Sequence, residues 1–329
     1  MNSQKISIGV IGVGHLGQHH VKHYNNMKNI NLLGVHDIDF VQGKKIATTY
    51  NIKYFEDANE LMQKCDAISI VTPTESHYNV ALSAISNFNC NVFIEKPITE
   101  TITQADRLIK EAKKRGLVIQ VGHIERLNPA LKALSKYDLN PKFIDIQRLA
   151  PYTVRGTDVP VVLDLMIHDV DILLSLVKSQ VESIHASGVS ILTNSVDIAH
   201  ARIRFKNGTV SSITSSRVAK DKVRKIKIFQ ENLYSTIDLL LSQTEIYNIT
   251  KNKNLIENAL HIEPFTEDND KYIVYEKPKI DDYDPLRAEL DNFVNSTLKI
   301  EKPIVSGIAA RNALDVVIKI NEMILEDLN

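Results

Sequence analysis

The sequence predicts an α/β protein with two domains: a doubly wound parallel sheet over residues 1–122 and an α+β domain with a large, mainly antiparallel open sheet over residues 123–329. The first observation is length, because 329 residues exceed what one compact domain usually holds. The second is that short apolar segments alternate with helix-like segments as far as Gly122, which is typical of βαβ units. The third is a change beyond Gly122 to longer segments in which apolar and polar residues alternate, as in antiparallel strands.

The first domain is predicted from Val- and Ile-rich runs that each lead into a helical segment. The expected strands cover residues 5–11, 30–36, 54–55, 67–71, 91–95 and 118–121. The expected helices begin after the glycine-rich turn at residue 17 and cover 41–50, 58–64, 76–86 and 103–115, with Gly116 ending the last one. Because helices separate the strands, we expect the strands to be parallel and the helices to cover both faces of the sheet.

The second domain is predicted from period-two alternation. Residues 199–205 alternate apolar and basic side chains, and Asn207-Gly208 then supplies a hairpin turn. Residues 225–228 alternate in the same way. Helices are expected near 161–177, 285–296 and 307–326, and we allow for the last of them to pack back on the first domain. The polar stretch at 250–279 receives no assignment.

The turn after the first strand carries the motif G-x-G-x-x-G at Gly12, Gly14 and Gly17. Between a strand and a helix this motif is typical of a Rossmann dinucleotide site, in which amides at the helix start face the pyrophosphate. The second strand ends at Asp37, where a carboxylate can accept hydrogen bonds from the ribose hydroxyls, although Asp37 could also be an ordinary polar residue at a strand end. The cofactor is expected to be NAD rather than NADP, because the carboxylate would repel a 2′-phosphate.

Ligands of a doubly wound sheet bind beyond the carboxyl ends of its strands. Three such ends stand out in this chain: residues 72–74 with His77 close behind, residues 95–97, and residues 121–126. A cation at Lys96 would lie close to a nicotinamide ring, although a surface lysine at a turn is the alternative. The residues expected to bind the cofactor are Gly12, Gly14, His15, Leu16, Gly17, Asp37, Thr72, Pro73, Thr74, His77, Glu95 and Lys96.

The expected helix at 161–177 is apolar on most of its circumference and should be largely buried. At about 100° per residue, Asp164, His168, Asp171 and Ser175 fall on one narrow stripe. A polar stripe on a buried helix is costly unless its members are paired or face a solvated cleft. One interpretation is a histidine held by neighbouring carboxylates for structural reasons. The other is a general base, His168, oriented by Asp164.

Three ordered motifs together resemble the glucose-fructose oxidoreductase and inositol dehydrogenase family, Gfo/Idh/MocA. They are the glycine motif, Glu95-Lys96-Pro97, and Asp164-x-x-x-His168-x-x-Asp171, and the resemblance spans the full length of the chain. It implies an N-terminal Rossmann domain, a C-terminal α/β domain whose open sheet serves homo-oligomerisation, as a dimer or tetramer, and hydride transfer at a sugar or cyclitol carbon. It also implies that Lys96 and His168 form the catalytic pair and that Asp164 supports them.

Residues 121–129 and 155–159 are similar to a subgroup of this family that contains UDP-N-acetylglucosamine 3-dehydrogenases. This similarity implies hydride transfer from C3 of UDP-N-acetylglucosamine to NAD, in the synthesis of lipid A or surface glycans. The residues expected to contact the substrate are His123, Arg126, Asn128, Arg155 and Asp171. One arginine can donate two parallel hydrogen bonds to the oxygens of a phosphate. The candidates for holding a diphosphate are therefore Arg126, Arg148, Arg155, Arg217 and Arg224.

Two alternatives to this substrate stay open. The same kind of enzyme could oxidise a free sugar, a cyclitol or another small molecule. A non-catalytic NAD(H)-binding regulatory protein is the alternative of a different class, because a fold does not guarantee chemistry. The presence of Lys96, Asp164 and His168 together disfavours it, since a sensor has little need of these three side chains.

Composition excludes several classes of function. With 39 basic and 40 acidic residues, the chain has no large electric field to attract nucleic acid or a membrane surface. It contains no unbroken apolar run of about 18 residues and no signal-peptide region, so we expect a cytoplasmic location. Cys65 and Cys90 are expected to be reduced and packed. His19, His20 and His23 are interpreted as a solvated helical face, and no metal site is expected.

Overall fold

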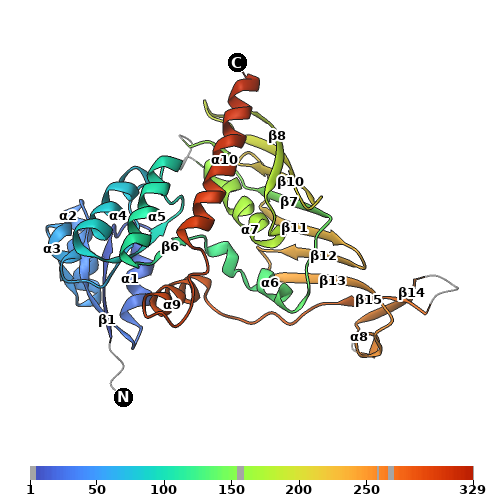
Figure 1. Ribbon diagram of the computed structural model, residues 1–329, viewed down its shortest axis with the longest axis horizontal. Coiled ribbons are helices and arrows are strands. Elements are labelled where there is room, and N and C mark those ends of the chain that lie inside the picture. The colour runs from blue at the N-terminus through green and yellow to red at the C-terminus, as the bar shows by residue number, and fades with distance from the viewer. Residues whose placement is uncertain (1–4, 154–158, 258, 266–269, 329) are drawn as a thin grey trace. The chain divides into compact units, whose positions relative to one another are not determined.

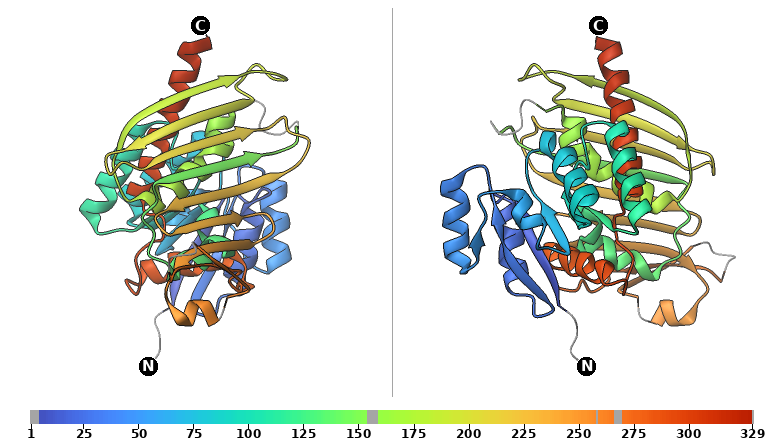
Figure 2. Two further views of the ribbon diagram at one scale, coloured as in Figure 1. Left: turned by 90° about the vertical axis from the view of Figure 1, so that its right-hand side faces the viewer. Right: turned by 60° about the vertical axis from the view of Figure 1, so that its left-hand side comes forward.

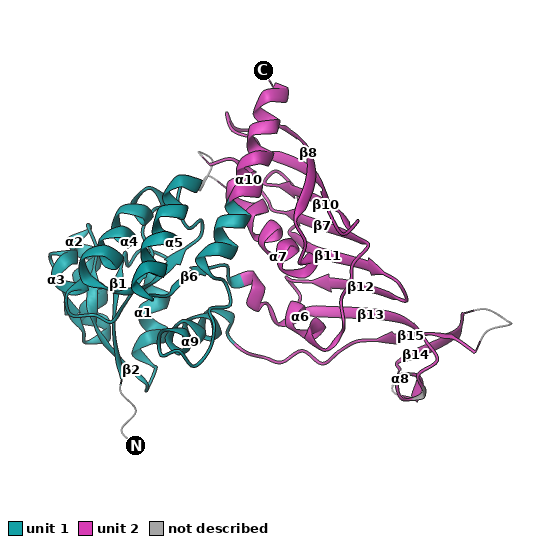
Figure 3. Cartoon of the chain, viewed as in Figure 1, with its two compact units in different colours: residues 1–124, 284–314 teal, residues 125–283, 315–329 magenta. Residues whose placement is uncertain are grey.

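The computed structural model describes residues 5–153, 159–257, 259–265 and 270–328 (Figure 1). The chain forms two compact units, coloured separately in Figure 3. Unit 1 comprises residues 1–124 and 284–314, and unit 2 comprises residues 125–283 and 315–329. Residues 284–314 thus belong to the unit of the parallel sheet, although the sequence-based boundaries place them in the second domain and allow only for the helix near 307–326 to pack on the first.

Unit 1 is built on a six-stranded parallel sheet with the order β3-β2-β1-β4-β5-β6. The strands are β1 (Ile6–Ile11), β2 (Ile30–His36), β3 (Lys53–Tyr54), β4 (Ala67–Ile70), β5 (Asn91–Glu95) and β6 (Ile119–Gly122). The strand order reverses between β1 and β4, which is where doubly wound sheets open a crevice for ligands. The predicted Rossmann sheet is confirmed.

The helices of unit 1 follow the strands as the sequence predicts. They are α1 (Gly17–Asn25), α2 (Phe40–Tyr50), α3 (Ala58–Met62), α4 (Thr74–Phe88) and α5 (Ile102–Arg115). Helix α9 (Pro285–Thr297) adds a sixth helix from far along the chain, and the first turns of α10 (Gly307–Leu328) also belong to this unit. The residues of α9 in the core are Leu290, Phe293 and Val294, and Phe293 meets Phe93 of β5 edge to face at 5.7 Å between ring centroids. Long-range packing therefore assigns α9 to unit 1.

Unit 2 contains a nine-stranded sheet with the order β14-β15-β13-β12-β11-β7-β10-β9-β8. Its strands are β7 (Phe143–Leu149), β8 (Val181–Val189), β9 (Ile198–Phe205), β10 (Val210–Ser216), β11 (Val223–Gln230), β12 (Leu233–Asp238), β13 (Gln243–Thr250), β14 (His261–Pro264) and β15 (Tyr272–Glu276). The pair formed by β7 and β10 is parallel, and the other seven pairs are antiparallel. The predicted mainly antiparallel sheet is confirmed, and β14, β15 and the short helix α8 (Lys253–Glu257) account for much of the unassigned stretch at 250–279.

The two faces of the nine-stranded sheet differ. Isoleucines of the central strands, such as Ile146, Ile213 and Ile226, are buried on one face, where α7 (Ile167–Val177) packs. In the left view of Figure 2 the other face is turned to the viewer and α7 lies behind the sheet. On the open face an aromatic row crosses five neighbouring strands, with ring centroids 4.8 to 5.9 Å apart: Phe143, Phe229, Tyr234, Tyr247 and Tyr275.

The segment predicted as one helix at 161–177 is two helices of different type. Residues Val162–Met166 form a π-helix, and α7 follows from Ile167 to Val177. A π-helix bonds residue i to i+5 and therefore has a wider turn than an α-helix, so the 100° step used to align Asp164 with His168 does not hold across this junction. Short helical turns also lie earlier in unit 2, namely the 3-10 helix Ile124–Leu127, α6 (Pro129–Lys132) and the 3-10 helix Ala133–Lys136.

Cys65 and Cys90 are both free and buried, as predicted. Burial raises the pKa of each thiol, to about 12 for Cys90. In the described part of the chain, no helix combines the length and apolar character that a membrane span needs.

Candidate active site

The glycine-rich loop joins β1 to α1 at the carboxyl edge of the parallel sheet. Gly12 has φ +85°, and a Cβ atom there would lie 2.6 Å from the carbonyl oxygen of Val71. A Cβ atom at Gly17 would lie 1.9 Å from the carbonyl oxygen of Gly12, so helix and loop pack too closely for any side chain. At Gly14, by contrast, no heavy atom of the described residues other than its own chain neighbours lies within 4 Å of the position a Cβ would occupy. The loop therefore leaves open space at Gly14, as the approach of a pyrophosphate to the backbone would require.

Asp37 follows β2 and is tied to the same loop. Its Oδ2 accepts a hydrogen bond from the amide of Val13 at 2.6 Å, and its Oδ1 accepts one from the amide of Asp39 at 2.8 Å. The side-chain amide of Gln42 donates to the carbonyl oxygen of Val13 at 2.8 Å and holds the loop from the other side. A carboxylate offers about four lone-pair sites, so Asp37 keeps the capacity to accept from ribose hydroxyls.

The end of β4 and the start of α4 carry another group of predicted cofactor residues. Pro73 is the exposed N-cap residue of α4, and Thr72 and Thr74 are half-buried beside it. His77 is only 1% exposed, and its Nδ1 and Nε2 lie 2.8 and 2.9 Å from the carbonyl oxygens of Pro97 and Thr72. Burial lowers the pKa of His77, and the two carbonyl contacts oppose that change. The structure thus engages both ring nitrogens of His77 with the protein backbone.

Lys96 follows β5 directly, is half-buried, and precedes Pro97 through a cis peptide bond. The neighbouring Glu95 places its Oε1 3.1 Å from Nε2 of His20, and Nδ1 of His20 lies 2.9 Å from the hydroxyl of Ser69. His20 is 1% exposed. The prediction of a solvated face is therefore wrong for His20, although His19 is exposed. The signal that could have identified His20 is its spacing from Gly17 and Tyr24, which share the buried face of α1.

The third histidine of α1, His23, is partly buried and lies 3.3 Å from a carboxylate oxygen of Asp284. Within the described ranges, no group of three or more histidine, cysteine or acidic side chains is arranged to hold a metal ion.

In unit 2, the predicted general base and its orienting acid lie on either side of the junction between the π-helix and α7. Asp164 belongs to the π-helix, His168 is the second residue of α7, and both are partly buried. Ser175, the last member of the predicted stripe, donates its hydroxyl to the carbonyl of Ile172 at 2.6 Å.

A cluster of buried ion pairs lies beside α7. The carboxylate of Asp171 accepts hydrogen bonds from Nε and Nη2 of Arg126, at 2.6 and 2.7 Å. Arg148 makes the same bidentate contact with Asp169, at 2.9 and 2.8 Å, and also donates a hydrogen bond to Glu125 at 3.0 Å. Burial raises the pKa of Asp169, and the Arg148 guanidinium opposes that rise. Asp169 lies off the polar stripe of Asp164 and Asp171, so helical periodicity does not single it out.

The comparisons agree with this architecture in both units. Residues 6–123 match the GFO/IDH/MocA oxidoreductase family with an NAD-binding Rossmann fold, and residues 148–232 match the GFO/IDH/MocA C-terminal domain. A UDP-N-acetylglucosamine 3-dehydrogenase from Acidithiobacillus ferrooxidans is 33% identical over 308 residues, which are 93% of each chain. The chain belongs to the GFO/IDH/MocA family. It is an oxidoreductase of the kind that uses a nicotinamide cofactor, as predicted.

Two further GFO/IDH/MocA comparisons show how the similarity is distributed. The solved structure of the UDP-N-acetylglucosamine 3-dehydrogenase GnnA from A. ferrooxidans aligns with a TM-score of 0.88 and 31% identity, and covers 99% of both chains. A myo-inositol 2-dehydrogenase from Thermotoga maritima is 27% identical over 232 residues, which are 64% of this chain and 69% of that protein. The first similarity thus includes the whole of unit 2, and the second covers about two thirds of the chain.

The structure engages most of the predicted arginines of this GFO/IDH/MocA protein with other parts of unit 2. Arg148 is 2% exposed and Arg217 is 7% exposed, and Arg217 donates to the carbonyl of Val159 and lies 3.7 Å from Asp197. Arg224 has a side chain that is 43% exposed, and it contacts Glu125 at 2.9 Å. The corresponding value for Arg126 is 16%. Arg126 and Arg224 therefore offer the most accessible guanidinium groups of the four, and Arg155 lies outside the described residues.

Two other predicted substrate contacts, Asn128 and His123, lie near the start of unit 2 in the sequence. Asn128 caps α6 by accepting from the amide of Ala130 at 3.0 Å, and its side-chain amide donates to the carbonyl of Leu239 at 3.0 Å. His123 is 1% exposed.

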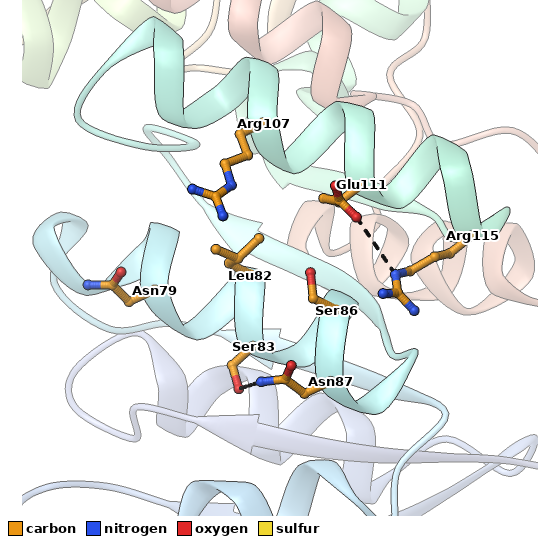
Figure 4. Close-up of a pocket in the computed structure, with 8 residues that line it drawn as sticks. All are labelled: Asn79, Leu82, Ser83, Ser86, Asn87, Arg107, Glu111 and Arg115. Carbon is orange, nitrogen blue, oxygen red and sulfur yellow. Dashed lines mark hydrogen bonds and ion pairs between the residues drawn. The ribbon is translucent and has the colours of Figure 1, made fainter.

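A groove of about 470 Å³ lies on the helical layer of unit 1, between α4 and α5 (Figure 4). It is lined by Asn79, Leu82, Ser83, Ser86, Asn87, Arg107, Glu111 and Arg115. None of these residues belongs to the predicted site, and Arg115 is already engaged by Asn89 at 2.8 Å. The groove is therefore separate from the candidate active site.

Proposed function

We propose that this protein is an NAD-dependent UDP-N-acetylglucosamine 3-dehydrogenase. The observation that carries the proposal is the 33% identity to an enzyme of that name over 93% of each chain. This similarity extends through unit 2, the unit that contains most of the residues expected to contact the substrate. The inositol dehydrogenase similarity, at 27% over 64% of the chain, supports the broader activity on CH–OH groups.

The proposed cofactor is NAD rather than NADP. Asp37 and Asp39 place two carboxylates beside the position expected for the adenosine ribose, and Ile38 between them is 95% exposed. A 2′-phosphate at this position would face like charge and no arginine from this turn. Backbone groups of residues 12–17 would hold the pyrophosphate, and residues 72–74 together with Glu95 and Lys96 would border the nicotinamide end. Bound NAD would supply the hydride acceptor.

In the proposed reaction, His168 accepts the proton of the sugar 3-hydroxyl as C3 is oxidised. Asp164 orients the imidazole and stabilises its protonated form. The ammonium of Lys96 stabilises the negative charge that develops on the 3-oxygen, where a preorganised charge often supplies the largest catalytic contribution. All three roles rest on the family motif.

The proposed substrate contacts are His123, Arg126, Asn128, Arg155 and Asp171. The ion pairs refine this set, because Arg126 already faces the carboxylate of Asp171 and Arg224 faces that of Glu125. The diphosphate would therefore bind guanidinium groups that already contact a carboxylate. The guanidinium of Arg224 is the more accessible of the two.

We further propose that the protein is a homo-oligomer, a dimer or a tetramer. The aromatic row on the open face of the nine-stranded sheet supports this, since Phe143, Phe229 and Tyr247 are 38%, 40% and 37% exposed. A cytoplasmic location is proposed as well, which two free buried cysteines support. The proposed 3-keto product would enter lipid A or surface-glycan synthesis.

The experiment that tests the function is a screen of NADH formation by the purified protein. UDP-N-acetylglucosamine, other UDP-sugars, free N-acetylglucosamine and myo-inositol serve as substrates, and the product is reduced with borodeuteride so that mass spectrometry locates the new label. Deuterium at C3 of UDP-N-acetylglucosamine supports the proposal. Faster oxidation of an uncharged polyol would replace the substrate, and tight NAD binding with no turnover on any of them would favour a regulatory protein.

A further inference from the structure

The segment Glu95-Lys96-Pro97 is anchored on each side of Lys96 by a different buried histidine. His20 of α1 contacts the side chain of Glu95, and His77 of α4 contacts the backbone carbonyl of Pro97. Both histidines are 1% exposed, and all these residues belong to unit 1. The importance of this arrangement rests on the proposed function, in which Lys96 must hold its ammonium beside a reacting oxygen.

The contacts of His20 define one hydrogen-bonded chain. Its Nε2 lies 3.1 Å from Oε1 of Glu95, and its Nδ1 lies 2.9 Å from the hydroxyl of Ser69 on β4. A neutral ring with its proton on Nε2 satisfies both, because it donates to the carboxylate and accepts from the serine. Edge-to-face contacts with Phe93 and Tyr24, at 5.3 and 6.4 Å between centroids, fix the plane of the ring.

The carboxylate of Glu95 is also confined from the side of β6. A Cβ atom at Gly122 would lie 2.8 Å from Oε1 of Glu95 and 2.9 Å from both Cδ and Oε2. Glycine at this position therefore leaves the space that the carboxylate occupies between β6 and His20. A larger residue would force the carboxylate away from its histidine partner.

His77 fixes the other end of the segment and connects it to β4. Its Nδ1 contacts the carbonyl of Pro97 at 2.8 Å, and its Nε2 contacts the carbonyl of Thr72 at 2.9 Å. Both partners are acceptors, so a neutral ring donates to one of them and a protonated ring donates to both; in either form the imidazole lies between the residue that follows Lys96 and the loop that follows β4. The groups around the ring are thus mostly backbone, and the carboxylates of Glu95 and Glu100 supply the nearby charges.

We infer that His20 and His77 are positioning residues that hold Lys96 in its catalytic place through the residues on either side of it. Neither histidine touches the substrate in this role. Each histidine contacts the segment Glu95-Lys96-Pro97 through one ring nitrogen, Nε2 for His20 and Nδ1 for His77. Because the two nitrogens differ, a side chain that replaces only one of them should affect the two positions differently.

The experiment exchanges each histidine for asparagine and for glutamine. The amide nitrogen of glutamine reaches the position of Nε2, whereas that of asparagine reaches only the position of Nδ1. H20Q should therefore keep the donor to Glu95 and retain kcat within a few fold of the wild type. H20N should lose that donor and reduce kcat by about 10- to 100-fold, because small misplacements of a catalytic group cost up to about that much.

For His77 the order of the two variants should be reversed. H77N keeps the contact with Pro97 and loses the anchor at Thr72, so it should raise the KM for NAD by a larger factor than it lowers kcat. H77Q keeps the contact with Thr72 and should show the opposite split, with a lower kcat and a nearly unchanged KM. A purely structural role would lower the stability of both variants alike and would produce no such reversal.

H19N and H19Q on the exposed face of the same helix are the matched controls, and both should behave as the wild type. G122A should reproduce the loss seen in H20N while leaving every histidine in place. Equal kcat values for H20N and H20Q, or for H77N and H77Q, in folded proteins would overturn the inference.

A readout independent of activity separates this inference from the proposed function. Hydrogen exchange of the Lys96 and Ile98 amides should accelerate at least several fold in H20N and H77Q, and much less in H20Q and H77N. If the wild type oxidises no sugar but this pattern appears, the proposed function fails and the positioning role stands. If the wild type is active and exchange is unaffected in all four variants, the positioning role fails alone.

Discussion

Unit 1 and unit 2 hold their polar groups in different ways. In unit 1 the glycine loop, Asp37 and His77 are fixed mainly by hydrogen bonds to backbone atoms. In unit 2 the polar groups near α7 are fixed by ion pairs between side chains, and Arg148 with Asp169 is the most buried of those described. Backbone contacts are specified by short local motifs, whereas ion pairs need residues from distant parts of the chain. The unit with the NAD-binding Rossmann fold can therefore be recognised from a few adjacent residues, whereas the ion pairs of unit 2 cannot.

The largest effect is expected from breaking the buried pair in unit 2. R148M should leave the carboxylate of Asp169 buried without its guanidinium and destabilise the protein by about 3–5 kcal/mol, as is usual when one partner of a buried pair is removed. Chemical denaturation followed by circular dichroism measures the change. A loss below 1 kcal/mol would mean that the ion pairs of unit 2 matter no more than surface ones.

Removing the proposed catalytic groups should affect turnover and leave folding intact. K96M and H168N should each lower kcat by about 10²-fold or more, equivalent to about 2.7 kcal/mol of transition-state stabilisation. The dissociation constant for NAD, measured by fluorescence, should change little. Near-normal turnover in both variants would remove the proposed mechanism.

Asp197 lies in unit 2, but backbone amides donate most of the hydrogen bonds to its carboxylate. It therefore tests whether a carboxylate held in this way stabilises unit 2 as the ion pairs do. Burial raises its pKa, but hydrogen bonds from the amides of Ile191, Leu192 and Thr193 and from the Thr193 hydroxyl outweigh burial and lower it to about 2. Because the folded-state pKa lies below the unfolded value of 3.8, the stabilisation is present above about pH 4 and is lost as the pH falls toward 2.

D197N should therefore lower the free energy of unfolding at pH 7 by about 1–3 kcal/mol and flatten its decrease between pH 4 and pH 2. Thermal unfolding over that pH range is the measurement. If wild type and D197N lose stability in parallel as the pH falls, the carboxylate contributes nothing through its ionisation.

The carboxylate at the end of β2 is predicted to decide between the two nicotinamide cofactors. D37S should shift the ratio of NAD to NADP affinity by about 10-fold toward NADP, equivalent to about 1.4 kcal/mol, because it removes the charge that repels a 2′-phosphate. Titration of each cofactor by calorimetry gives the ratio. An unchanged ratio would assign the discrimination to other residues.

The smallest effect is expected at an exposed ion pair of unit 2. Arg204 and Glu182 lie 3.0 Å apart, with side chains 52% and 51% exposed. R204A should change the free energy of unfolding by less than about 1 kcal/mol, since exposed pairs are screened by water and salt. Measured beside R148M, it shows how much burial contributes to a pair of the same chemistry.

Much of unit 1 could be predicted from the sequence, because its motifs are contiguous. The run from β1 through Gly17 to Asp37 specifies a strand, a turn, a helix and a second strand within the first 37 residues. The place of α9 could not be predicted in this way. Its helical pattern is visible, but its packing on Phe93 through Phe293 depends on residues 200 positions apart.

The candidate site divides in the same manner. Lys96 and Asp37 lie at strand ends, as predicted, but the burial of His20 was missed because a cluster of histidines resembles a solvated face. In unit 2, the π-helix at Val162–Met166 breaks the regular spacing on which the predicted polar stripe depended. Asp169 and Arg148 meet through the pairing of α7 with β7, which periodicity alone does not reveal.

The return of α9 to the first sheet affects how this protein is made. When the ribosome has synthesised residues 1–124, the side of the sheet that Leu290, Phe293 and Val294 will cover is still bare. The hydrophobic core of unit 1 therefore cannot be completed until about half of the chain has been translated after residue 124. A fragment that ends at residue 124 would expose this apolar surface and tend to aggregate.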